Sequence, residues 1–193
     1  MADRNQPLPH GGADPGKVGI NGSLEKDINL LIANKLKRYL EAEGIEVVMT
    51  RETDQGLYDP SVSNKKVDDM KRRLAIIEEA DPAMVISIHQ NSYHEEYVHG
   101  AQVFYYTTST VGKTLAETLQ AHLISEVDPE NHRGAKDNNS YYLLKKTSVP
   151  IVIVECGFLS NTREAEMLST DIYQEKLALA IHNGILQYIN SQN

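Results

Sequence analysis

PIVIVE, at residues 150–155, is the most apolar run of strand length in the chain, and it ends on a carboxylate. MVISIH, at residues 84–89, has the same character and ends on a histidine. Short apolar runs rich in β-branched residues are typical of strands that are buried on both faces. IEVVMT at 45–50 and AQVFYY at 101–106 are predicted strands for the same reason, and YYLLKK at 141–146 is a candidate for a short one.

Apolar residues between these runs recur every three or four positions, which predicts amphipathic helices. Strands that alternate with helices along a chain favour an α/β sandwich. We therefore expect one domain over residues 1–193, with a mostly parallel twisted sheet and helices on both faces. The predicted helices span residues 24–40, 67–77, 111–123 and 177–188.

Composition narrows the range of partners. The chain has 193 residues, of which 27 are acidic and 19 are basic, so its formal net charge is −8. Nucleic-acid binding depends on lysine and arginine that neutralise phosphates, and we expect no such partner. An apolar run of about 18 residues would predict a transmembrane segment, and the sequence has none. The start, MADRNQPLPHGG, also lacks the apolar stretch of a signal peptide.

Four polar residues could carry chemistry. His89 and Glu155 each end an apolar strand, where open α/β sheets place their ligands. His10 lies in the glycine-flanked turn PHGGADPG, and Glu25 lies in the first turn of the first predicted helix. Two histidines and one carboxylate, with a fourth position left open, are the pattern of a catalytic zinc. Glu155 would then be available as a general base. For each residue alone, an ordinary surface or strand-end role is the alternative.

Three further residues are candidates for substrate binding. Asn91 lies two positions after His89 and points to the same side of an extended segment. Arg73 and Arg133 could contact carboxylates of the substrate, and a solvated or ion-paired arginine is the alternative reading of each. The single Cys156 cannot form an internal disulfide, and we interpret it as a small buried thiol that packs.

Five segments in order carry a resemblance over nearly the whole chain: HGGADPGKVG, LEKDINLLIANKLKRYLEAEGIEVVMTR, MVISIHQNS, HGAQVFYY and PIVIVECGFLSN. They resemble the zinc-dependent N-acetylmuramoyl-L-alanine amidases that cut bacterial peptidoglycan. The resemblance implies one Zn²⁺ bound by His10, Glu25 and His89, with Glu155 as the catalytic residue. The region from Gly56 to Lys71 is more similar to the spore-cortex and germination-type branch than to short autolysin domains.

The resemblance implies a reaction and a place for it. Metal-activated water would hydrolyse the amide between N-acetylmuramic acid and L-alanine, with Glu155 as general base. The partner would be peptidoglycan, a glycan strand with its stem peptide, at an extracytoplasmic or cell-wall location. The export signal or anchor would lie outside this chain, and an accessory protein is a further partner to consider.

Residues 1–9 depart from the family pattern. Family members carry an apolar strand ending in Asp-Pro-Gly directly before the first zinc histidine, whereas ADRNQPLP stands here at 2–9. We therefore expect the first strand to be atypical or truncated. These residues suggest one alternative to the amidase reading, a non-catalytic cell-wall-binding or regulatory domain of the same fold. A zinc peptidase that acts on free peptides is a separate alternative.

Overall fold

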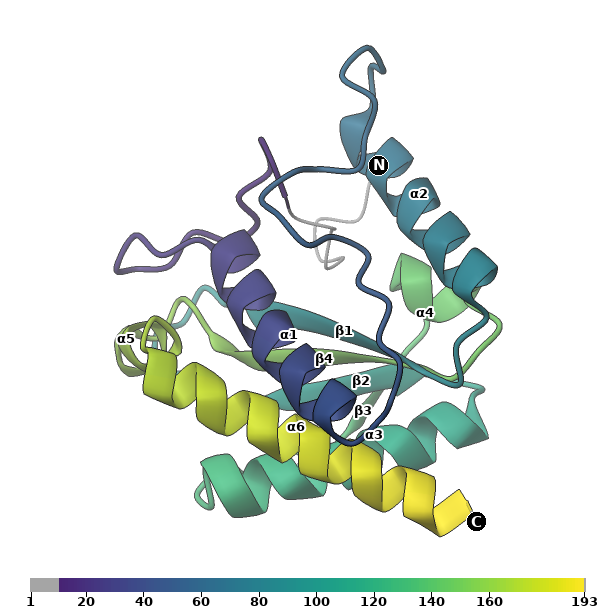
Figure 1. Cartoon of the computed structure of the whole chain (residues 1–193). Helices are drawn as coiled ribbons and strands as arrows, with labels where there is room; N and C mark the ends of the chain where they lie inside the picture. Colours follow the sequence, from purple (N-terminus) through teal and green to yellow (C-terminus); the bar gives the residue numbers. More distant parts are fainter. Residues whose placement is uncertain (1–10, 193) are drawn as a thin grey trace.

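The computed structural model describes residues 11–192, and the structural statements below refer to that part of the chain. The elements are, in chain order, α1 (Glu25–Ala42), α2 (Lys65–Ala80), β1 (Val85–Asn91), β2 (Gln102–Tyr106), α3 (Thr110–His122), a π-helical turn (Leu123–Val127), β3 (Lys136–Asn138), α4 (Tyr142–Lys146), β4 (Ile151–Phe158), α5 (Thr162–Leu168) and α6 (Asp171–Gln192). Helices and strands are interspersed along the chain (Figure 1), but they do not alternate strictly as the sequence predicts, because α2 follows α1, β2 follows β1 and α6 follows α5 directly.

The strands form one sheet in the order β1-β4-β2-β3. β1 is parallel to β4 and β2 is parallel to β3, whereas β2 and β4 are antiparallel. The sheet is therefore mostly parallel, as predicted. β4 lies between two neighbours, and all eight of its residues are buried. PIVIVE thus supplies the central strand.

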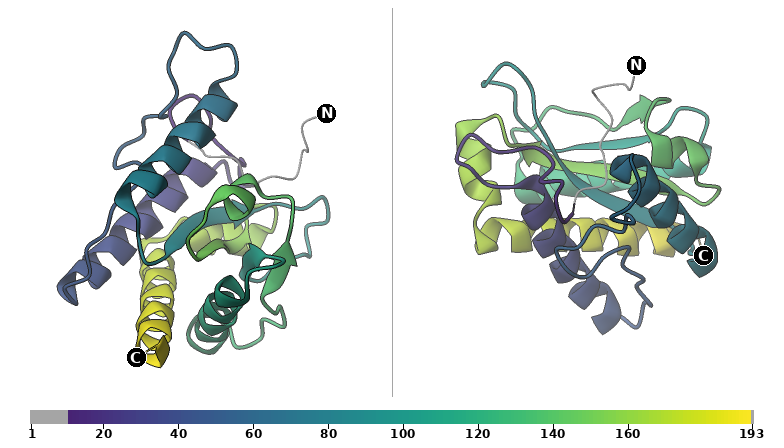
Figure 2. Two further views of the ribbon diagram at one scale, coloured as in Figure 1. Left: turned by 90° about the vertical axis from the view of Figure 1, so that its right-hand side faces the viewer. Right: turned by 90° about the horizontal axis from the view of Figure 1, so that it is seen from above.

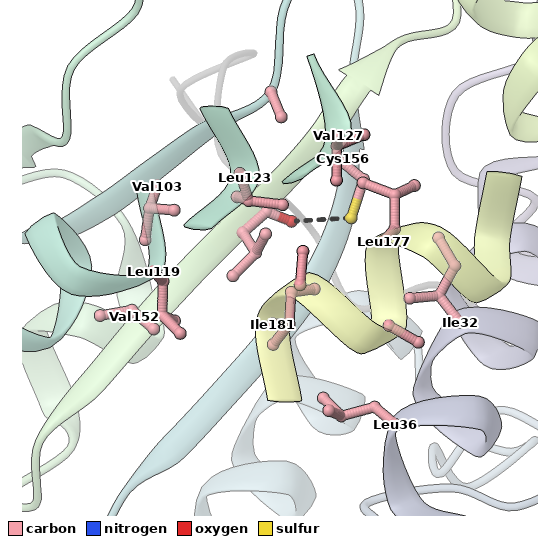
Figure 3. Packing of buried hydrophobic residues seen from close by; sticks show 14 of the residues in the cluster. Ile32, Leu36, Val103, Leu119, Leu123, Val127, Val152, Cys156, Leu177 and Ile181 are labelled. Atoms are coloured by element: carbon pink, nitrogen blue, oxygen red, sulfur yellow. Dashed lines mark hydrogen bonds between the residues drawn. The ribbon is translucent and has the colours of Figure 1, made fainter. Parts of the chain in front are cut away.

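Helices cover both faces of the sheet, and alternate residues of β4 contact the two layers (Figure 2). Val152, Val154 and Cys156 pack in the larger core with residues of α1, α3 and α6 (Figure 3). Ile151 and Ile153 belong to a smaller core with residues of α2 and α4. This period of two is the pattern expected for a strand buried on both faces.

Local signals set the helix ends. Asn64 accepts a hydrogen bond from the backbone N–H of Val67 at the start of α2, and Ser109 caps α3 in the same way. Gly44, with a φ of 78°, follows the end of α1, where a left-handed conformation favours glycine. All four predicted helices are confirmed as α1, α2, α3 and α6, although α6 begins earlier than expected. The seven-residue α5 was not predicted, because it is too short to show a helical period.

Two predicted strands are wrong. Residues 45–50 form no strand, because a strand needs a hydrogen-bonded neighbour and β4 is the one strand partner of β1 among residues 11–192. Residues 141–146 contain the helix α4 instead of a strand. The side chain of Asn138 accepts hydrogen bonds from the backbone N–H groups of Ser140 and Tyr141, and this turn leads directly into the helix. Within the described range, no helix is long and apolar enough to cross a membrane.

Candidate metal centre and active site

His89 and Glu155 lie side by side at the carboxyl ends of β1 and β4. They are direct partners in the parallel register of the two strands, so their side chains leave the same face of the sheet. On its other side, Glu155 is paired with Gln102 of β2. His89 and Glu155 are 6% and 4% exposed. Two neighbouring strands therefore present an imidazole and a carboxylate, both buried, together at one edge of the sheet.

Glu25 brings a second carboxylate to this edge from the first turn of α1. It is 1% exposed, and its Oε1 atom lies 3.0 Å from Nδ1 of His89. Oε1 also accepts a hydrogen bond from the backbone N–H of Gln90, and Oε2 accepts one from the backbone N–H of Lys17. The helix N-terminus favours a negative charge at this position. These backbone donors hold the buried carboxylate in place.

His10, the third predicted ligand, lies outside the described residues, but the turn that follows it is fixed beside Glu25. The backbone N–H of Glu25 donates to the carbonyl oxygen of Lys17, and Nζ of Lys26 donates to that of Gly12. Gly12 has a φ of 59°, and a Cβ there would lie only 2.9 Å from the backbone nitrogen of Gly56. Glycine is therefore required in this turn.

The donor chemistry of the described residues fits two positions of a zinc site. Bonds of about 2.0–2.1 Å in a tetrahedral site put two ligand atoms about 3.3 Å apart. The separation of 3.0 Å between Glu25 Oε1 and His89 Nδ1 is close to that value. Residues 11–192 contain no group of three histidine, cysteine, aspartate or glutamate side chains that could hold a metal ion. His10, the third predicted ligand, lies outside this range, and its role stays a prediction.

Cys156 follows Glu155 but is not part of the polar cluster. Its side chain is fully buried, on the opposite face of β4 from Glu155, in the larger hydrophobic core. Burial raises the pKa of the thiol, and the neighbouring charge of Glu155 raises it further. A thiol that resists ionisation is a poor nucleophile, which agrees with the interpretation of Cys156 as a packing residue.

The sequence pattern of the N-acetylmuramoyl-L-alanine amidases matches residues 8–187. The chain belongs to this family. It is 36% identical over 186 residues to the germination-specific N-acetylmuramoyl-L-alanine amidase of Bacillus subtilis, covering 95% of this chain and 78% of that one. The resemblance drawn from the sequence motifs is confirmed, and the protein is an N-acetylmuramoyl-L-alanine amidase.

Solved structures of other amidases share the fold. The CwlD amidase of Clostridioides difficile, solved in complex with the GerS lipoprotein, superposes with a TM-score of 0.92 and is 39% identical, covering 94% of this chain and 95% of that one. The AmiC2 amidase of Nostoc punctiforme is 32% identical with a TM-score of 0.81, covering 95% and 94%. The predicted α/β fold with a mostly parallel sheet is thereby confirmed.

The three predicted substrate-binding residues of the amidase lie in different surroundings. Asn91 ends β1, but a register irregularity after His89 separates the two, and its side chain accepts a hydrogen bond from the backbone of Ser92. Arg133 stacks over the ring of Phe158 at 4.7 Å and contacts Gln102, the neighbour of Glu155. Burial lowers the pKa of Arg133.

Arg73 lies on α2 and lines the same cavity as His89. Its Nε donates to Asp69 at 2.7 Å in a buried ion pair, and Nη1 donates to the hydroxyl of Thr50. This arrangement corresponds to the ion-paired alternative considered for Arg73. Its role in substrate binding stays a prediction, as do those of Asn91 and Arg133.

Three buried residues around the site were missed by the sequence analysis. Gln90 donates through its side chain to Asn29, which in turn lies 3.4 Å from Glu25. Glu164 accepts hydrogen bonds from the backbone N–H groups of Gly100 and Phe158, and so ties the end of β4 to the loop before β2. Asn29 could have been found, because it lies four residues after Glu25 on one face of a helix. Glu164 had no comparable signal.

Proposed function

We propose that this amidase hydrolyses the amide between N-acetylmuramic acid and L-alanine in bacterial peptidoglycan in a zinc-dependent reaction. The observation that carries the proposal is the contact of Glu25 with His89 directly beside Glu155. A catalytic zinc site needs two such ligands and a nearby carboxylate that does not bind the metal. The family membership supplies the scissile bond.

His10, Glu25 and His89 would hold one zinc ion. When bound, the ion would polarise the amide carbonyl and raise the acidity of a nearby water molecule. The backbone donors from Lys17 and Gln90 keep the carboxylate of Glu25 oriented toward His89. Such outer contacts fix the ligands before the metal arrives.

Glu155 would transfer the protons. Its position opposite His89 in the β1–β4 register brings it to the edge where substrate would meet the ligand set. There it would accept a proton from the attacking water and return one to the departing nitrogen of L-alanine. Its burial limits access of bulk water, so the carboxylate would act on a single positioned molecule.

Two alternatives differ from this proposal in measurable ways. A non-catalytic cell-wall-binding or regulatory domain would need neither Glu155 nor the Glu25–His89 contact, and this chain has both. A zinc peptidase acting on free peptides would use the same site but would not require the glycan. A comparison of stem peptides with and without attached N-acetylmuramic acid separates the proposed amidase from such a peptidase.

We further propose that the protein acts at the cell wall during germination or spore-cortex processing. Support comes from the name of its Bacillus subtilis relative, the germination-specific amidase. The CwlD amidase was solved in complex with a lipoprotein, so an accessory protein is a reasonable partner for this chain as well.

The test is mass spectrometry of purified peptidoglycan fragments digested in ¹⁸O-labelled water, with and without a chelator. We expect release of stem peptides that begin with a free L-alanine amine, and one ¹⁸O atom in the new lactyl carboxylate. Cleavage of another bond, or the same products at the same rate after metal removal and without re-added zinc, would contradict the proposal.

A further inference from the structure

A cavity of about 340 Å³ is lined by the turn at residues 11–14 and by the beginning of α2. Its volume is within the range of small-molecule sites, about 300–1,000 Å³. Its lining includes Ala13 of the turn, Tyr58, and Lys65 and Asp69 of α2. We call this cavity the turn pocket.

The turn pocket is held close to the candidate metal centre. The backbone N–H of Ala13 donates to the hydroxyl of Tyr58 at 3.2 Å, which joins the turn to the loop before α2. Nζ of Lys26 donates to the carbonyl oxygen of Gly12 at 2.9 Å, and Lys26 directly follows Glu25 on α1. The turn that lines the pocket is therefore tied to the first turn of α1, where Glu25 lies.

Both acidic side chains of the turn pocket have basic partners. A carboxylate oxygen of Asp14 lies 3.3 Å from Nζ of Lys66. Asp69 forms an ion pair with Arg73 at 2.7 Å and also accepts a hydrogen bond from the backbone N–H of Leu57. The negative charges that line the pocket are therefore already balanced by neighbouring cations.

Lys65 adds a positive charge that no carboxylate among residues 11–192 pairs with. Its Nζ lies 5.3 Å from the centroid of the Tyr58 ring, in the geometry of a cation–π contact. Lys65 is exposed and Tyr58 is half-buried, so a ligand arriving from solvent can reach both. The turn pocket therefore offers one unbalanced positive charge beside an aromatic surface, which favours an anionic ligand with an apolar part.

We propose that the turn pocket binds a carboxylate of the stem peptide, with Lys65 as the ionic partner and the Tyr58 ring in contact with aliphatic parts of the peptide. The identity of this ligand rests on the proposed function, which brings a stem peptide to Glu25 and His89. In the substrate the lactyl carboxyl group is bound as an amide, so the carboxylates that remain belong to the peptide. Arg73 was a candidate for this contact, but its guanidinium is engaged by Asp69.

Equilibrium binding to the zinc-depleted protein tests the turn pocket without hydrolysis. The probes are a stem peptide that begins with a free L-alanine amine and the same peptide with its carboxylates amidated, each titrated in a calorimeter. The unmodified protein should bind the acid form about fivefold more tightly, which is the upper end for a pair of exposed charges. This preference should disappear in about 1 M salt, where the screening length falls to about 3 Å.

Lys65→Met and Lys71→Met are a matched pair of variants. Lys71 is also an exposed lysine of α2, but it does not line the turn pocket. Lys65→Met should reduce the preference for the acid form to less than about twofold, whereas Lys71→Met should keep it. Lys65→Arg retains the charge and should keep most of the preference.

The turn pocket and the proposed function fail in different ways. If the protein releases no stem peptide from peptidoglycan, yet Lys65→Met still removes the preference for the acid peptide, the proposed function is wrong and the carboxylate site stands. Equal affinity of the unmodified protein for the two peptides, or no binding of either, would overturn the site. An unchanged preference in Lys65→Met would also overturn it, as would an equal loss in Lys71→Met, because the effect would then come from net charge.

Discussion

PIVIVE at 150–155 and IEVVMT at 45–50 are both strand-length runs rich in β-branched residues, yet one is the centre of the sheet and the other forms no strand. β4 pairs with β1 on one side and with β2 on the other, and it is buried throughout. Residues 45–50 line a cavity of about 510 Å³ together with residues of β1, and Glu46 and Val48 are exposed. Composition can show that a segment favours an extended conformation, but a strand also needs a hydrogen-bonded neighbour, which composition does not show.

The largest difference between the two segments should lie in catalysis. Glu155→Gln should lower the rate of peptidoglycan hydrolysis by about 10² to 10⁴, because it removes the proton acceptor. Glu46→Gln is the matched control, since Glu46 is an exposed glutamate within residues 45–50, and its rate should stay within about twofold. Initial rates on labelled peptidoglycan measure both. Normal activity of Glu155→Gln would show that Glu155 is not the general base.

Substitutions in β4 should also lower the free energy of unfolding more than substitutions in residues 45–50. Ile151→Ala in β4 should lower the free energy of unfolding by about 2–5 kcal/mol, because it leaves a cavity in the packed core. Ile45→Ala should cost less than half of that, since Ile45 is half-buried and already borders a cavity of about 510 Å³ that residues of α1, α2 and β1 also line. Urea unfolding of the two variants provides the comparison. Equal losses would mean that residues 45–50 are as well packed as β4.

Residues that contact the predicted zinc ligands without binding the metal should have a smaller effect on zinc affinity. Asn29→Ala removes the amide that joins Gln90 to Glu25 and should weaken zinc binding by about tenfold. Asn34→Ala, an exposed position on the same helix, is the control and should leave the affinity unchanged. Competition with a chromophoric chelator measures both values. The same affinity for the two variants would limit the metal site to its direct ligands.

The smallest expected effect is on the pH dependence of stability, through Glu164 near the end of β4. Burial raises the pKa of Glu164 above its ordinary value of 4.5, although the N–H groups of Phe158 and Gly100 oppose this. The folded protein therefore holds this proton more tightly than the unfolded chain, and stability is lost as pH rises from 4.5 through the raised pKa. Glu164→Gln should flatten that part of a melting-temperature profile, whereas exposed Glu166→Gln should not. If the melting temperature of Glu164→Gln still fell with rising pH in this range, another group would be responsible for the pH dependence.

Sequence reasoning predicted those parts of the fold that are encoded locally. The periods of α1 and α2 and the apolar runs of β1 and β4 were sufficient to predict an α/β sandwich. Residues 45–50 were mispredicted because the missing neighbour is not visible in their composition, and 141–146 because a turn at Asn138 precedes them.

The candidate site was predictable to a similar extent. His89 and Glu155 were found from strand ends, and the structure brings both to the edge where Glu25 begins α1. Gln90 and Glu164 were not found, because their roles depend on backbone groups distant in sequence. The metal-binding role of His10 and the catalytic role of Glu155 stay predictions.

The zinc dissociation constants of the unmodified protein and of Glu25→Ala, His89→Ala and Glu155→Gln test the central claim most directly. Loss of an outer contact typically costs about 10- to 100-fold in affinity, so loss of a ligand should cost more than about 100-fold. We predict that Glu25→Ala and His89→Ala fall in that range while Glu155→Gln binds zinc as the unmodified protein does. Equal affinity of His89→Ala and the unmodified protein would contradict the account.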